Sequence, residues 1–293
     1  GPAEEEQAFE VTEKVARLMI PVHICFEKDG TFKCGDQSWP RIMIERQPAF
    51  MEMLGNLVHL RKLPREEQAK HHVPPANAFA DSDRIEYPSE DFKSSPTPNP
   101  SALGAIAIVC SKILLTNGQY EVVKIAAVDV ISCRILLNHL VCSDAKASVK
   151  DWYHSKTGLD RFELLEHARQ AGYKVLKGWK AARTILHKFV DTNTIIVGQD
   201  LRRDLDALRM IHGRAIDIAK VVEKAAGGPL SRQQLSIPSI SRTFMGITLS
   251  TDPQFGQDVL QLVFAVRGMA MWSIRNGEEL AKKAKAVALD YQR

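Results

Sequence analysis

Hydrophobic positions in the later two-thirds of the chain fall into short apolar runs and into runs with helical spacing. The short runs predict strands at 104–109, 121–131, 135–141 and 195–197. The helical spacing predicts helices at 160–171, 178–190, 201–212, 258–274 and 277–290. Strands that alternate with helices are typical of the α/β class, so we expect residues 101–293 to form a mixed sheet flanked by helices.

The first hundred residues have a different pattern, which predicts an accessory region at 1–100. Apolar spacing predicts helices at 10–20 and 49–60, and the Asp29-Gly30 turn predicts a hairpin between HICFE and TFKC. Residues 73–100 contain six prolines with almost no periodicity, which indicates a linker or extended arm and not a core element. Gly1-Pro2 resembles the remnant of a protease cleavage site and is left aside.

Composition limits the class of protein. The chain has 293 residues, of which 45% are hydrophobic and 25% are charged, enough for one core of normal size and an appendage. No apolar run approaches the roughly 18 residues that a membrane-spanning helix needs, so we expect a soluble, intracellular protein without a membrane partner. The five cysteines are odd in number and lie mostly among apolar residues, which indicates reduced thiols.

Two of these cysteines, Cys25 and Cys34, lie in the same region as His23 and the pair His71-His72, and a zinc site is one interpretation. Their spacing lacks the tight pair of cysteines that structural zinc sites use. The hairpin around Asp29-Gly30 is the plainer explanation of this segment.

The segment 194–216, TIIVGQDLRRDLDALRMIHGRAI, predicts a buried strand that turns through Gly198 into an amphipathic helix. It resembles the second motif of the REX-like DEDD-type 3′–5′ RNA exonucleases, a family with the ribonuclease H fold. Further fragments resemble the same family in the same order: EVVKIAAVD and ILLNHLV, VKDWYHSKTGL, GWKAAR and HGRAID. The GWKAAR fragment is similar to fungal members. The resemblance covers roughly residues 105–272.

The family carries a D-x-E sequence on its first strand, and the resemblance places this motif at residues 109–111. Val109 then stands in place of the aspartate, and Ser111 stands in place of the glutamate. Asp129 is another candidate for the aspartate, but its register assigns it to the next strand. The first motif is therefore expected to have lost both of its acids.

The third motif of the family supplies a histidine base and the last of four metal-binding carboxylates. The resemblance places Gln257 at the position of the histidine and Leu262 at the position of the aspartate. In the second motif, Gln199 replaces a histidine, and Asp204 matches the metal-binding aspartate. Asp204 is then the one carboxylate of the four that remains.

A single aspartate cannot hold two dications about 4 Å apart, and glutamine has no titratable nitrogen with which to act as a base. The sequence therefore predicts a non-catalytic pseudo-exonuclease, not an enzyme, with no metal and no small-molecule cofactor. A residual metal-dependent exonuclease is the remaining catalytic alternative, with Asp129, Asp200 and Asp217 as its acids. The plainer interpretation of Asp204 is a solvated or paired surface acid.

A retained fold without its catalytic groups indicates that the surface carries the function. We expect a scaffold with a protein partner in a nuclear RNA-processing or gene-regulatory complex. RNA binding without cleavage is the alternative, because basic residues gather on two predicted helices and such residues contact phosphates. These candidates are Lys177, Lys180, Arg183, Lys188, Arg202 and Arg203. The plainer interpretation is a solvated helix face, since Asp204 and Asp206 interrupt the second cluster and the formal net charge is only +4.

Overall fold

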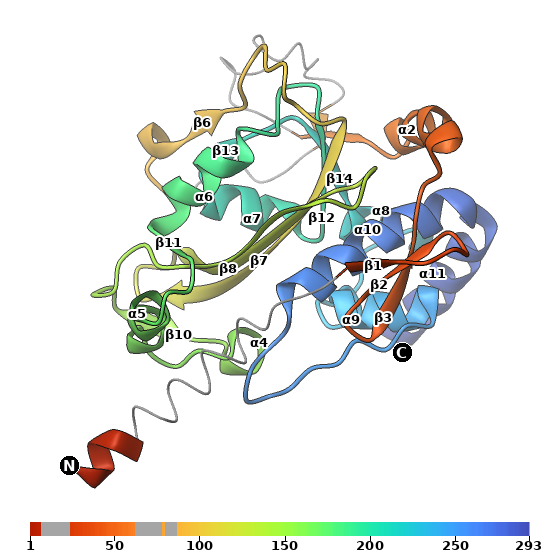
Figure 1. The fold of residues 1–293 in the computed structure, drawn as a ribbon. Coiled ribbons are helices and arrows are strands. Elements are labelled where there is room, and N and C mark those ends of the chain that lie inside the picture. The colour runs from red at the N-terminus through yellow and green to blue at the C-terminus, as the bar shows by residue number, and fades with distance from the viewer. Residues whose placement is uncertain (7–23, 62–77, 80–86, 293) are drawn as a thin grey trace.

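The computed structural model describes residues 1–6, 24–61, 78–79 and 87–292 (Figure 1). The predicted helix at 10–20 lies outside these residues, as do His23 and the pair His71-His72.

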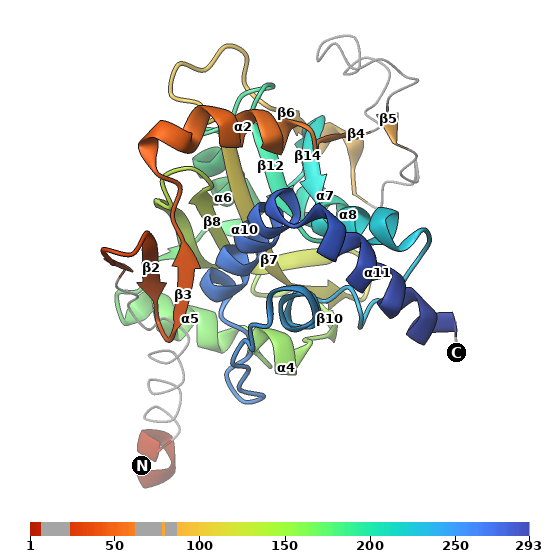
Figure 2. The same ribbon diagram turned by 90° about the vertical axis from the view of Figure 1, so that its right-hand side faces the viewer.

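A mixed sheet runs through the middle of the described part of the molecule (Figures 1 and 2). Its long strand β8 is antiparallel to both of its neighbours, β9 and β7, whereas β12 and β14 continue the sheet in parallel with β7. The predicted strands of this region are confirmed. In spatial order the strands are β11 (Val175–Leu176), β9 (Ile135–Val141), β8 (Tyr120–Asp129), β7 (Ala105–Leu115), β12 (Ile195–Gly198), β14 (Arg214–Asp217), β4 (His59–Arg61) and β5 (Ala78–Phe79), and β10 (Val149–Asp151) pairs with β7.

Helices cover both faces of this sheet, and strand β7 shows why. Alternate side chains of a strand point to opposite faces, and here Ala107 and Val109 join one core cluster while Ile108 and Cys110 join another. The first cluster includes α8 (Ile218–Ala226), α10 (Val259–Arg275) and α11 (Gly277–Gln292), and the second includes α6 (Gly178–Leu186) and α7 (Leu201–Ala207). The predicted α/β class is confirmed. The remaining helical elements are η1 (Ile44–Arg46), α2 (Gln47–Gly55), η3 (Ser89–Asp91), α4 (His154–Thr157), α5 (Glu163–Gln170), α9 (Ile237–Ile240) and η4 (Ser241–Met245).

The predicted N-terminal hairpin is confirmed and is packed against helix α10. Strands β1 (Ile24–Phe26), β2 (Thr31–Cys34) and β3 (Gln37–Pro40) form a small antiparallel sheet. Phe32 and Trp39 are buried, and their rings lie 5.1 and 6.4 Å from the ring of Phe264. The buried Arg267 donates to the carbonyl oxygens of Pro40 and Val130, each at 2.7 Å. This part of the accessory region therefore shares its core with the main domain.

Two predictions of secondary structure need correction. The helix predicted at 49–60 ends at Gly55, and residues 59–61 form strand β4, which pairs with β14. The helix predicted at 201–212 ends at Ala207, because Met210–Ile211 form strand β13 beside β6 (Lys93–Ser94). In both places a pairing between distant segments overrides the local helical spacing.

The described end of the proline-rich arm is part of the folded domain, contrary to prediction. Tyr87 and Ser95 are buried, and β6 pairs with β13. Arg183 of α6 donates to the carbonyl oxygen of Asp91 at 2.7 Å. Residues 87–95 therefore contact α6 and β13 and do not form a free linker. Within the described ranges, no helix is long and apolar enough to cross a membrane.

Candidate functional site

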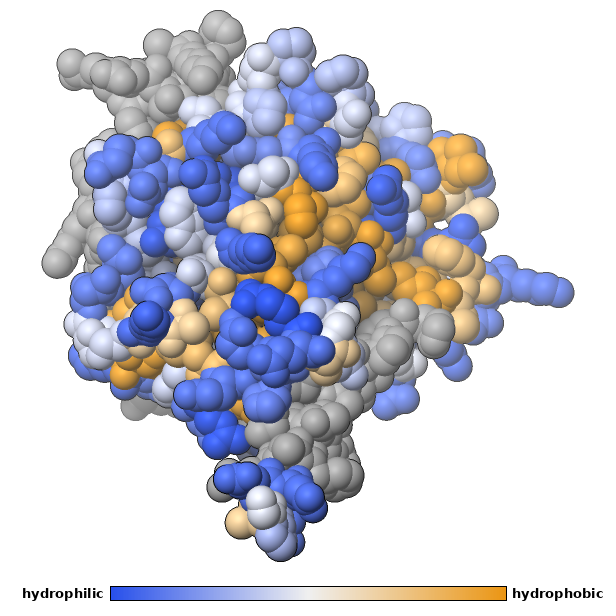
Figure 3. Space-filling view, turned by 60° about the vertical axis from the view of Figure 1, so that its left-hand side comes forward, coloured by the Kyte–Doolittle hydropathy of each residue, from blue (hydrophilic) through white to orange (hydrophobic). Residues whose placement is uncertain are grey.

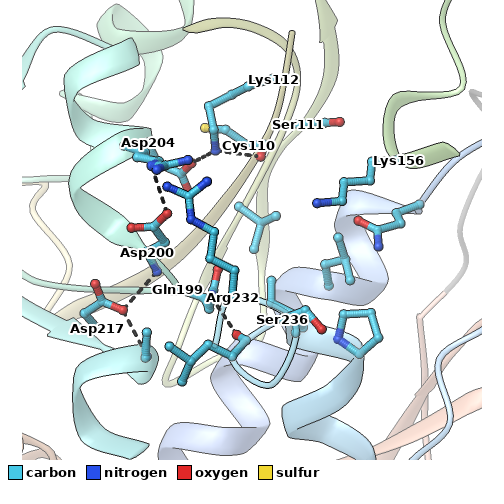
Figure 4. Close-up of a pocket in the computed structure, with 18 of the residues that line it drawn as sticks. Cys110, Ser111, Lys112, Lys156, Gln199, Asp200, Asp204, Asp217, Arg232 and Ser236 are labelled. Carbon is cyan, nitrogen blue, oxygen red and sulfur yellow. Dashed lines mark hydrogen bonds and ion pairs between the residues drawn. The ribbon is translucent and has the colours of Figure 1, made fainter. Parts of the chain in front are cut away.

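A pocket of about 510 Å³ lies beside the carboxyl ends of the parallel strands β12 and β14 (Figure 4). Ligands of open α/β sheets commonly bind at such strand ends. Gln199 and Asp200 follow β12, and Asp217 ends β14, while residues 109–112 of β7 form the neighbouring wall. Helices α7, α8 and α10 and the segment 232–238 form further parts of the lining.

The pocket brings together the five positions that the resemblance assigns to the family's catalytic groups. Val109 and Ser111 come from β7, and Asp204 comes from α7. Gln257 comes from the loop before α10, and Leu262 comes from the first turn of α10. Val109 and Leu262 are buried and belong to the core below the pocket. The order of motifs along the chain therefore leads to one place in the fold.

Asp204 is paired with a residue that the sequence analysis did not select. Its carboxylate is buried and forms an ion pair with the ammonium group of Lys112, which also lies 3.4 Å from the carbonyl oxygen of Cys110. Burial, the largest single effect, lowers the pKa of Lys112, but the neighbouring groups, chiefly the Asp204 carboxylate, together outweigh it, and the pKa of Lys112 is raised. The interpretation of Asp204 as a solvated surface acid is therefore wrong, and that of a paired acid is confirmed.

The other acids proposed for a residual nuclease have local structural partners. Asp217 accepts hydrogen bonds from the backbone N–H groups of Asp200, Leu201 and Ala219 at 2.9–3.1 Å, and so fixes the turn between β12 and α7. Burial raises the pKa of Asp217 to about 6. Asp200 pairs with Arg203 at 3.2 Å. Asp129 is outside the pocket lining and accepts from Ser132 at 2.7 Å in the turn after β8.

Cationic and aromatic side chains line the mouth of the pocket. Lys156 and Arg232 are exposed, and the guanidinium of Arg203 lies 5.2 Å from the centre of the Tyr120 ring. Tyr153 has a φ of 45°, a conformation that a bulky residue adopts at a cost. Sequence reasoning did not find these residues, apart from Arg203, because they come from separate segments without a shared motif.

The loop before α10 reaches the pocket through a glycine. The N–H of Gln257 donates to the carbonyl oxygen of Lys156 at 2.7 Å. Gly256 has a φ of +77°, and a Cβ at this position would lie 2.5 Å from the backbone of Gly158. A side chain at residue 256 would therefore separate Gln257 from Lys156.

The six basic residues predicted to contact phosphates do not form one surface. Arg203 lines the pocket, Arg202 pairs with Asp206 at 3.6 Å, and Lys188 borders a different cavity near Pro98. Lys177 and Lys180 are exposed near the start of α6 and do not line the pocket.

The prediction for Arg183 is wrong, because this residue is buried. Its guanidinium donates to the carbonyl oxygens of Asp91 and Arg209 and stacks on Trp179 at 5.1 Å. Arg183 therefore holds the segment 87–95 against α6, and its charge is not available to a ligand.

Two divalent ions, as the resemblance implies, do not fit the side chains of this pocket. Val109, Ser111 and Leu262 offer no carboxylate, and Asp204 is engaged by Lys112. Magnesium and manganese prefer several oxygen ligands. In the described part of the chain, no group of three or more His, Cys, Asp or Glu side chains is placed to hold a metal ion.

We expect millimolar Mg²⁺ or Mn²⁺ to leave the melting temperature of the protein nearly unchanged. A ligand at 100 times its dissociation constant adds about 2.7 kcal/mol to the stability of a native state that binds it. Thermal unfolding with and without each cation measures this effect. A rise of several degrees that EDTA reverses would show that the pocket holds a metal ion after all.

Comparisons with known proteins relate the chain to RNA exonucleases. No family model matches it. The chain is 30% identical over 142 residues to small RNA degrading nuclease 2 of Arabidopsis thaliana, a match that covers 48% of this chain and 28% of the relative. It is 34% identical over 79 residues to RNA exonuclease 3 of Schizosaccharomyces pombe, covering 26% of this chain and 14% of the relative. The chain thus spans less than a third of either relative.

Among solved structures, the fold is similar to the pseudoubiquitin hydrolase–RNA exonuclease module of Saccharomyces cerevisiae Pan2 in complex with AAGGAA RNA. The TM-score is 0.50 at 12% identity, and the match covers 72% of this chain and 35% of that chain. The similarity supports the α/β fold with a central mixed sheet.

These comparisons correct one prediction about function. The prediction that the chain is not an enzyme is contradicted, because the relatives that it matches in sequence are named as RNA-degrading nucleases and RNA exonucleases. The relationship to an exonuclease family is supported. The narrower predictions of a fungal-type member and of a degenerate site are not confirmed.

Proposed function

We propose that this exonuclease-like domain takes the end of a single-stranded RNA into the pocket beside Asp204. The observation that carries the proposal is the lining of the pocket, where cationic side chains from separate segments meet two tyrosines. Nucleic-acid sites without sequence preference combine such cations with aromatic rings on which bases stack.

The charges of the pocket favour an anionic ligand. Four acids line the pocket, and each has a partner within the chain. Asp204 and Asp200 are each paired with a cation, Lys112 and Arg203. Asp217 and Glu223 accept backbone N–H groups instead. Lys156 and Arg232 have exposed side chains, and among the described residues neither forms an ion pair with a carboxylate. These two cations are therefore available to neutralise phosphates, a contribution that depends on salt concentration.

The aromatic residues supply surfaces for bases. Tyr120 and Tyr153 both line the pocket, and stacking of a base on an aromatic side chain contributes about 1 to 3 kcal/mol. The volume of about 510 Å³ lies within the range of roughly 300 to 1,000 Å³ that small ligands occupy. A pocket of this size has room for the end of a single strand.

The comparisons support RNA as the nucleic acid. The two relatives are named for the degradation of small RNA and as an RNA exonuclease, and the similar yeast module was solved with RNA. Because these proteins are longer than the matched region, we assign to this chain only the capture of an RNA end. Whether the chain then shortens the RNA is a question for experiment.

Fluorescence anisotropy with a labelled single-stranded RNA tests the proposal. The double charge reversal Lys156→Glu/Arg232→Glu is expected to weaken binding by about tenfold or more, since it replaces two phosphate-neutralising cations with acids. Denaturing gels of the same samples, run with and without Mg²⁺, report whether the bound RNA is shortened.

The matched control is Lys177→Glu/Lys180→Glu, which makes the same change of charge at exposed lysines outside the pocket lining. We expect the affinity of this variant for RNA to lie within about twofold of that of the unchanged protein, because salt screens the long-range effect of the two charges. A larger loss in the control than in the pocket variant would place RNA binding on α6 and contradict the proposal.

A scaffold role and a nuclear location stay predictions. Figure 3 shows hydrophobic residues gathered across the middle of one face, with hydrophilic residues around them. Within the described ranges, nothing on that face specifies the chemistry of a protein partner. The pocket, by contrast, has a charge and an aromatic lining that match RNA.

A further inference from the structure

The ion pair between Lys112 and Asp204 is an enclosed charged contact of the pocket. The side chains of Lys112 and Asp204 are 18% and 4% exposed. Lys112 comes from β7 and Asp204 from the first turn of α7, so the contact joins the sheet to the helix (Figure 4). Both residues line the cavity.

A buried carboxylate needs a cation beside it, because an unpaired charge in a protein interior is costly. Lys112 supplies one positive charge from within the chain. A divalent ion bound to Asp204 would have to displace the ammonium group of Lys112 or lie next to it. Two positive charges in direct contact inside a protein repel each other strongly.

The ammonium group of Lys112 can donate a hydrogen bond to a ligand while it remains paired with Asp204. A lysine has three N–H donors. Asp204 takes one of them, and the carbonyl oxygen of Cys110 lies within reach of a second at 3.4 Å. In the described residues these are the hydrogen bonds of Lys112, so a third donor remains for a group that enters the pocket.

We propose that Lys112 is the phosphate-binding residue at the inner end of the pocket, a cation built into the chain that contacts the RNA without a divalent ion. Asp204 then acts as the counter-ion that holds Lys112 in place and weakens its attraction for phosphate. The inference rests on the proposed RNA binding. It adds which residue receives the phosphate and that capture is independent of metal.

Asp204→Asn gives the sharpest test, because it keeps the shape of the side chain and removes its negative charge. We expect this variant to bind single-stranded RNA about tenfold more tightly, the scale of one charge-assisted hydrogen bond. Lys112→Met should weaken binding by about tenfold for the same reason. The affinity of the unchanged protein for RNA, measured once in EDTA and once in Mg²⁺, should differ by no more than about twofold.

If Lys112→Met fails to fold, the double variant Lys112→Met/Asp204→Asn removes both charges and takes its place. This double variant should bind about tenfold less tightly than Asp204→Asn alone. Circular dichroism checks the fold of each variant before its affinity is measured.

Two results would overturn the inference while the proposed function stands. In one, Asp204→Asn and EDTA both weaken binding, as expected if Asp204 holds a metal ion that contacts the phosphate. In the other, the Lys156→Glu/Arg232→Glu variant loses affinity but changes at Lys112 and Asp204 have no effect. If the unchanged protein does not bind RNA, the proposed function and the inference both fail.

Discussion

Trp39→Ala lowers the free energy of unfolding by about 3 to 5 kcal/mol, the range for removing a large aromatic side chain from a core. Trp39 is 1% exposed, and its indole packs near the ring of Phe264. Gly268 of α10 faces the same indole, because a Cβ there would lie 3.4 Å from it. Removal of the indole leaves a cavity between the N-terminal sheet and α10. Urea unfolding followed by circular dichroism measures the loss.

Ser38→Ala is the control for this change, since Ser38 precedes Trp39 in the same strand and is exposed. We expect it to alter stability by no more than about 0.5 kcal/mol. Equal effects of the two substitutions would show that β1–β3 do not share the core of the main domain. The predicted instability also extends to a chain that lacks residues 3–100, which would lose Phe32, Trp39, Phe50 and Leu54 from that core.

Glu121→Gln is expected to stabilise the protein at pH 8 by up to about 3 kcal/mol and to have little effect near pH 4. Burial, with a smaller contribution from Asp144, raises the pKa of Glu121 from 4.5 to about 7. The folded protein therefore holds this proton more tightly than the unfolded chain does. Stability then falls as the pH rises through the interval between the two pKa values, and stays lower above it.

Urea unfolding at several pH values measures this difference. Glutamine has the shape of glutamic acid and no charge to bury, so the fall in stability between about pH 4.5 and 7 should shrink in Glu121→Gln. Glu163→Gln, at an exposed position of α5, should change stability by no more than about 0.5 kcal/mol at any pH. A Glu121→Gln variant with the same pH dependence as the unchanged protein would contradict the account of this buried acid.

Much of the fold follows from the sequence because its signals are local. Strands β7, β8 and β9 are apolar runs of strand length, and α10 is capped by Asp258, whose carboxylate accepts from the N–H of Leu260 at 2.9 Å. Residues 57–61 show where local signals fail. Leu57 and Val58 continue the apolar spacing of α2, yet the next residues pair with β14. That pairing joins segments far apart in the chain, and spacing along one segment does not reveal it.

The residues of the site also fall into two groups, those that the sequence reveals and those that only the folded structure reveals. Motif order was enough to select residues that do meet in one pocket, such as Ser111 and Gln257. The role of Lys112 depends on a contact with Asp204, 92 positions later in the chain, and no spacing signals such a contact. Arg183 and Lys180 look alike in the helical pattern of α6, but only Arg183 lies where buried carbonyl groups need a donor.

Photocrosslinking tests the central claim, that the pocket receives the end of an RNA strand, most directly. A short single-stranded RNA with 4-thiouridine at its 3′ end is irradiated with the protein, and the crosslinked peptides are identified by mass spectrometry. We predict crosslinks to peptides that contain Tyr120 or Tyr153, the aromatic residues of the pocket. Crosslinks confined to the surface of α6 around Lys177 and Lys180 would contradict the account.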